Sequence, residues 1–146
     1  MKRRFVILHH IVGTSFKRDR NDHYDWMFET SPDPDAGLRT FATSRLPTTS
    51  GESVDGVWLP DHRRMYLDYE GPISGDRGRV IRVMAGEYER IVDHIDRWTA
   101  HLEAAPARPD LEIWNRKPIV EIGGTAGDGS LTLRDPTNDC KSSAGE

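Results

Sequence analysis

The chain has 146 residues, of which 36% are hydrophobic and 30% charged, so it is long enough for one domain with a substantial core but not for two. Its net charge of −4 argues against a protein that coats nucleic acid by bulk electrostatics, and its single cysteine, Cys140, excludes a disulfide framework and a cysteine-rich zinc site. No stretch is long and apolar enough for a signal-peptide core or a membrane span, so we expect a cytoplasmic protein.

Short apolar runs between glycines and prolines dominate the chain. The 13 glycines and 9 prolines favour many short strands over long helices, and so a mainly β fold. In chain order, strands are expected over residues 4–10, 23–29, 38–45, 57–62, 65–70, 79–84, 111–114, 119–122 and 130–134. The first is apolar on both faces, which is typical of a strand buried on both sides. In the run 65–70, Met65, Leu67 and Tyr69 are expected to face the core.

Residues 87–103 fit two structures. Tyr88, Ile91, Ile95, Trp98 and Leu102 recur at helical spacing, which slightly favours an amphipathic helix. However, residues 97–103 also alternate as a strand would, with 93–96 as the preceding turn. We expect one domain over residues 1–134, without a linker between two cores, and a frayed tail over 135–146.

The strand 23–29 has two different faces, because successive side chains on a strand point in opposite directions. One face carries the aromatic row Tyr24, Trp26 and Phe28, which requires a core. The other face carries His23 and Asp25, about 7 Å apart along the strand. An imidazole and a carboxylate at this distance can share a metal ion or a phosphate.

Three histidines and one aspartate are the candidate ligands: His10, His23, Asp25 and His62. Neutral imidazoles with a carboxylate suit a divalent transition ion such as Mn²⁺ or Zn²⁺. By spacing alone, structural or solvated histidines are the more common alternative. Tyr66 lies four residues after His62 and could either hydrogen-bond a phosphate oxygen or anchor the rim of the fold.

Four segments resemble, in order, the 3′-phosphoesterase domain of bacterial DNA ligase D and especially its small stand-alone relatives. They are RFVILHH (4–10), HYDWMFE (23–29), DHRRMYLDYEG (61–71) and GEYE (86–89). The resemblance covers about residues 4–103. It implies a compact single-domain β-barrel with short or no helices, and strands over 87–92 and 97–103.

The resemblance also implies a chemistry. His10, His23 and Asp25 would hold a Mn²⁺ ion, and His62 and Tyr66 would engage the scissile phosphate. The reaction removes a 3′-phosphate or 3′-ribonucleoside from a DNA primer end and leaves a 3′-hydroxyl, so nucleic acid 3′ ends and a repair ligase acting in trans are the expected partners. His62, when protonated, would stabilise developing charge or protonate the leaving oxygen.

Two positions depart from the family pattern. Met27 stands where the family carries a phosphate-contacting arginine, so either Arg45 or Arg39 replaces that charge or the activity is reduced. The connection 11–22 is longer than in the ligase domain and contains Lys17, Arg18 and Arg20, which could contact nucleic acid or belong to a plain insertion. The alternatives are therefore a non-catalytic nucleic-acid-binding module of the same fold and a hydrolase of small phosphorylated molecules.

Overall fold

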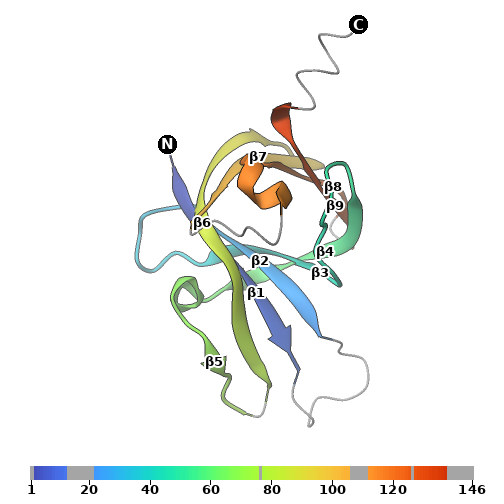
Figure 1. Ribbon diagram of the computed structural model, residues 1–146. Helices are drawn as coiled ribbons and strands as arrows, with labels where there is room; N and C mark the ends of the chain where they lie inside the picture. Colours follow the sequence, from blue (N-terminus) through green and yellow to red (C-terminus); the bar gives the residue numbers. More distant parts are fainter. Residues whose placement is uncertain (1, 13–21, 76, 106–111, 126, 138–146) are drawn as a thin grey trace, which may run out of the picture.

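A computed structural model describes residues 2–12, 22–75, 77–105, 112–125 and 127–137 (Figure 1). The strands are β1 (Arg3–Ile11), β2 (His23–Glu29), β3 (Leu38–Thr43), β4 (Ser53–His62), β5 (Gly71–Pro72), β6 (Arg79–Asp93), β7 (Arg97–Ala104), β8 (Ile119–Thr125) and β9 (Asp128–Arg134). Two short 3₁₀ helices, η1 (Arg64–Leu67) and η2 (Glu112–Arg116), complete the described elements. The mainly β fold predicted from the sequence is confirmed.

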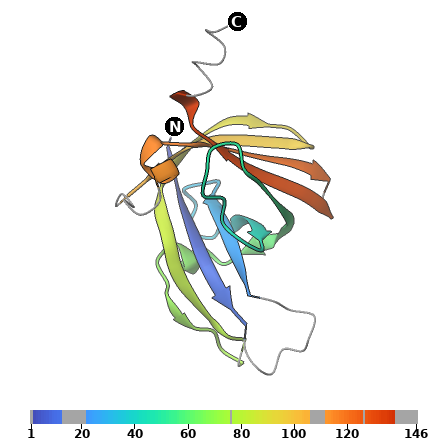
Figure 2. The ribbon, with the colours of Figure 1, turned by 45° about the vertical axis from the view of Figure 1, so that its right-hand side comes forward.

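The strands form a closed antiparallel barrel. Their order is β1-β2-β3-β4-β9-β8-β7-β6, and β6 pairs back onto β1, while the short β5 adds to the edge of β6. Closure gives each of these eight strands a partner on both sides over part of its length. In Figure 2, β1, β2 and β6 extend together below the ring that the other strands complete.

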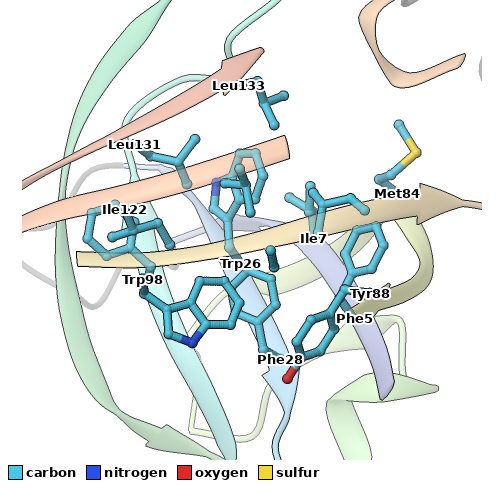
Figure 3. Packing of buried hydrophobic residues seen from close by; sticks show 14 of the residues in the cluster. Phe5, Ile7, Trp26, Phe28, Met84, Tyr88, Trp98, Ile122, Leu131 and Leu133 are labelled. Carbon is cyan, nitrogen blue, oxygen red and sulfur yellow. The ribbon is translucent and has the colours of Figure 1, made fainter. Parts of the chain in front are cut away.

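Alternation along β1 and β2 divides the apolar side chains between two clusters. Phe5, Ile7, Trp26 and Phe28 belong to the barrel core, where Trp98, Tyr88 and Leu131 pack with them (Figure 3). The other parity supplies a separate outer cluster, formed by Val6, Leu8, Met27, Leu38, Leu67 and Val80. Both faces of β1 are therefore buried, as its sequence predicted.

Residues 87–103 are strands, which confirms the expectation from the family resemblance over the one from periodicity. β6 continues to Asp93, β7 begins at Arg97, and residues 94–96 connect them. Tyr88 and Trp98 are buried in the barrel core, whereas Ile91 and Ile95 are 56% and 103% exposed. The apolar residues at helical spacing thus do not share one buried face.

Two predicted strands are wrong. Residues 64–67 form η1 instead, and Met65, predicted to face the core, is 48% exposed, while Leu67 is buried. After His62 the chain closes its hydrogen bonds locally, with the amides of Tyr66 and Asp68 donating to the carbonyl oxygens of Arg63 and Met65, so it forms a single turn. Likewise Ile113 and Trp114 lie in η2, from which Trp114 packs on the rings of Phe5 and Trp26.

The chain after β9 remains attached to the barrel for a short distance. The Asp135 amide donates a hydrogen bond to Ser50 Oγ at 2.8 Å, and Asp135 is buried. Residues 138–146, and with them Cys140, lie outside the described part of the chain. Within the described part, no helix has the length and apolar character needed to cross a membrane.

Candidate metal centre

His10, His23 and Asp25 come together on the outer face of the barrel. The antiparallel register of β1 and β2 places His10 opposite His23 and Leu8 opposite Asp25. These residues share the parity of the outer cluster, so their side chains leave the barrel beside Leu8 and Met27. The site therefore lies where β1 ends and β2 begins, in the lower part of Figure 2.

One atom from each of the three residues could bind a common ion, because the candidate ligand atoms lie within 4.8 Å of one another. Asp25 Oδ1 is 3.3 Å from His23 Nε2, and Asp25 Oδ2 is 3.8 Å from His10 Nδ1. Asp25 is only 1% exposed, and its Oδ1 has no hydrogen-bond partner among the described residues. A buried carboxylate in this state is costly unless a cation balances it.

The protonation of His10 is set by its contact with the β5–β6 turn. His10 Nε2 lies 2.9 Å from the carbonyl oxygen of Arg77. A carbonyl only accepts hydrogen bonds, so Nε2 carries a proton, and in the neutral imidazole Nδ1, which faces Asp25, presents its lone pair. Metal-bound histidines are commonly oriented in this way by a backbone carbonyl on the second ring nitrogen.

A pocket of about 430 Å³ opens beside these three residues. Its lining residues are His10, His23, Asp25, Met27, Leu59, Pro60, Asp61, His62, Arg63, Tyr66, Ile73, Arg77 and Val80. His62 and Tyr66, both predicted to engage phosphate, thus share a pocket with all three predicted metal ligands. Their rings are 6.4 Å apart, edge to face. His62 Nδ1 lies 3.0 Å from the Pro60 carbonyl oxygen, so Nδ1 carries a proton and Nε2 remains for a ligand.

Arg39 and Arg45, predicted to bind phosphate, do not line this pocket. Arg45 forms an ion pair with Glu52, and Arg39 lies over the Trp58 ring and pairs with Asp93. Met27 is 1% exposed and contributes an apolar wall at the position where the resembled family has an arginine.

Sequence reasoning missed both arginines that line the pocket, Arg63 and Arg77, and Arg77 is the one held in place there. Its Nε and Nη2 donate to Ser74 O and Ser74 Oγ at 2.7 and 3.1 Å, which holds the guanidinium in the turn that lines the pocket. The spacing of residues along the sequence gives no indication that Arg77 lies near the candidate ligands. Arg77 reaches the site only because residues 79–82 pair with residues 8–11 of β1.

The surroundings of the pocket are acidic on one side. His23 also lines an adjoining hollow of about 360 Å³, together with Asp22, Asp55 and Asp128. Lys17, Arg18 and Arg20, the basic residues of the long connection, lie outside the described residues. The described part of the chain therefore offers Arg63 and Arg77 as the positive groups lining the pocket.

The sequence matches no family model and no curated protein.

Proposed function

We propose that this chain is a Mn²⁺-dependent phosphoesterase that removes a 3′-phosphate or a 3′-ribonucleoside from nucleic acid ends during cytoplasmic DNA repair. The observation that carries the proposal is the buried Asp25 carboxylate, whose Oδ1 has no hydrogen-bond partner among the described residues and which has two imidazoles nearby. It lies on the wall of a pocket that His62 and Tyr66 also line. A repair ligase acting in trans would use the resulting 3′-hydroxyl.

The donor set fits the proposed ion. His10 Nδ1, His23 Nε2 and an Asp25 carboxylate oxygen would hold Mn²⁺, with Zn²⁺ as the other candidate, and three protein ligands leave positions open for substrate. A bound divalent ion would polarise the phosphate and lower the pKa of a coordinated water. The orphaned Asp25 oxygen is the part of the site that such an ion would satisfy.

The chain's own residues supply the remaining functions. Arg77, fixed by Ser74, would bind the phosphate oxygens in place of the charge that Met27 lacks. Tyr66 would donate its hydroxyl hydrogen to a phosphate oxygen. His62 holds its Nδ1 proton on Pro60, and a second proton on Nε2 would pass to the leaving oxygen. The apolar wall of Met27, Leu59 and Val80 would exclude water from that side of the phosphate.

A hydrolase of small phosphorylated molecules is the second candidate function. The adjoining hollow places three aspartates beside His23, and these carboxylates would repel the backbone of a polynucleotide. The pocket of about 430 Å³ is of the size that binds small ligands. A binding module without turnover is the third reading, and the test below separates the three.

The test is release of phosphate from a 3′-phosphorylated primer–template, with Mn²⁺ and with EDTA, compared with p-nitrophenyl phosphate. We expect Mn²⁺-dependent release from the primer, and loss of that release in His62→Ala. Arg77→Gln keeps the carbonyl that orients His10, so it tests the guanidinium alone; we expect its kcat/KM to fall about tenfold or more.

Arg45→Gln is the matched control, because it removes an arginine that lies away from the pocket, and we expect it to leave the rate unchanged. Turnover of p-nitrophenyl phosphate without turnover of the primer would favour the small-molecule hydrolase. Saturable primer binding without turnover would favour the binding module. Equal release by wild type and His62→Ala would refute the proposed mechanism.

A further inference from the structure

A second pocket, built around three arginines, lies well away from the candidate metal centre. We refer to it as the arginine pocket; its lining residues are Arg3, Thr30, Arg39, Tyr88, Arg90, Asp93 and Trp98, and its volume is about 320 Å³. Arg3 and His10 lie at opposite ends of β1, seven residues and so about 23 Å apart along the strand. No residue lines both pockets.

The charges of the arginine pocket do not balance. Asp93 is the single carboxylate among its lining residues, and it is shared: Oδ1 is 3.4 Å from Arg39 Nη1 and Oδ2 is 3.2 Å from Arg90 Nη1. The Arg3 side chain makes no hydrogen bond or ion pair with the part of the chain that the structure describes. Three guanidinium groups against one carboxylate leave the pocket with a net charge of about +2.

Part of this charge is held in place before any ligand arrives. The Arg39 guanidinium lies 4.1 Å above the centre of the Trp58 ring, an arrangement that fixes its plane and retains its charge. Tyr88 and Trp98 also line the pocket, and they are 3% and 2% exposed. Because these rings are covered, they offer no open face on which a nucleobase could stack. The part of a ligand that the arginine pocket recognises is therefore a negatively charged group.

We propose that the arginine pocket binds a phosphate monoester dianion, with the ester group directed to solvent. Two negative charges match the net charge of the pocket, and planar guanidinium groups bind phosphate oxygens in pairs. In the free protein, Asp93 occupies the acceptor position between Arg39 and Arg90. The phosphate competes with this carboxylate for the two arginines.

The test uses the full chain in EDTA, so that a metal-bound phosphate cannot contribute. Methyl phosphate binding is followed by calorimetry and by tryptophan fluorescence, at constant ionic strength set with KCl. We expect saturable binding that weakens about tenfold or more in Arg39→Gln and in Arg90→Gln. Asp93→Asn removes the internal competitor and is expected to bind more tightly than wild type.

Arg45→Gln is again the matched control, since Arg45 is an exposed arginine paired outside the pocket. A dianion requirement also predicts weaker binding below pH 6, where the monoester gains a proton, while sulfate, which keeps both charges, shows no such change. Arg90→Gln controls for misfolding of Arg39→Gln, because the Arg90 side chain is 59% exposed and, unlike that of Arg39, is not found over an aromatic ring of the described residues.

The monoester can belong to a small molecule or to the end of a nucleic acid chain. A tetranucleotide with and without a 5′-phosphate distinguishes these sources: tighter binding of the phosphorylated form than of methyl phosphate assigns the site to chain ends, and equal or weaker binding assigns it to small esters. Absence of saturable binding in EDTA, or equal weakening in Arg39→Gln and Arg45→Gln, would overturn the proposal.

Discussion

Asp25→Asn separates a metal site from a chance cluster of side chains. The substitution keeps the shape of the side chain and removes the negative charge of a residue that is 1% exposed. The wild-type carboxylate leaves Oδ1 without a hydrogen bond among the described residues, so the metal-free protein carries the cost of a buried, poorly compensated charge. We therefore expect metal-free Asp25→Asn to melt at or above the wild-type temperature.

The expected effect of metal is large enough to measure by thermal unfolding. At a metal concentration 100 times Kd, binding to the folded state alone contributes about 2.7 kcal/mol. The unfolding entropy for 146 residues is about 0.3 kcal/mol/K. Mn²⁺ should therefore raise the wild-type Tm by about 9 °C, and should raise that of Asp25→Asn by less than about 3 °C.

Asp61→Asn provides the matched control, because Asp61 lines the same pocket but does not belong to the group of three close ligand atoms. It should keep the full Mn²⁺-dependent rise. Calorimetric unfolding of wild type, Asp25→Asn and Asp61→Asn, each with Mn²⁺, with Zn²⁺ and with EDTA, measures these changes in Tm. An equal rise in wild type and Asp25→Asn, or no rise in wild type at any Mn²⁺ concentration, would refute the assignment of the metal to this cluster.

Two further predictions concern stability. Burial raises the pKa of Tyr88 to about 12, so its stabilising contribution is complete below about pH 10 and is lost as pH rises to 12. Tyr88→Phe should escape up to about 2–3 kcal/mol of that alkaline loss in the free energy of unfolding. Urea titrations at about pH 9 and about pH 11.5 measure this, and an equal fall in the free energy of unfolding for wild type and Tyr88→Phe would contradict it. A Cβ at Gly86 would lie 2.0 Å from the Glu103 carbonyl oxygen, so Gly86→Ala should destabilise by about 3 kcal/mol in chemical denaturation, whereas Gly127→Ala, where nothing lies within 4 Å, should not.

The β-strands of the fold were predictable where alternation and burial agree. In β2, the aromatic parity predicts the buried Trp26 and Phe28, and both are in the barrel core. The prediction fails at Met65, where alternation continues in the sequence after β4 has ended. An alternating pattern describes which side chains could share a face, but a strand forms only where a neighbouring strand has free hydrogen-bonding groups.

The candidate ligands were predictable, but the positive charges near them were not. His23 and Asp25 are two residues apart on one strand face, a relation that the sequence shows directly, and His10 joins them through the pairing of β1 with β2. Arg77 approaches His10 only through the pairing of β6 with β1. Arg39, predicted as one possible replacement for the charge missing at Met27, instead lies over Trp58 and lines the arginine pocket.

The position of the candidate ligands His23 and Asp25 depends on the barrel core, because β2 carries these residues and core residues alike. Trp26 is buried in the core and its Nε1 donates to Thr43 Oγ1 on β3 at 3.0 Å, which resists any slip of β2 relative to its neighbour. A slip of one residue would exchange the two faces of the strand and bring Asp25 into the core in place of an aromatic ring. The cost of that exchange keeps His23 and Asp25 on the outer face, opposite His10, so the closeness of the ligand atoms follows from core packing.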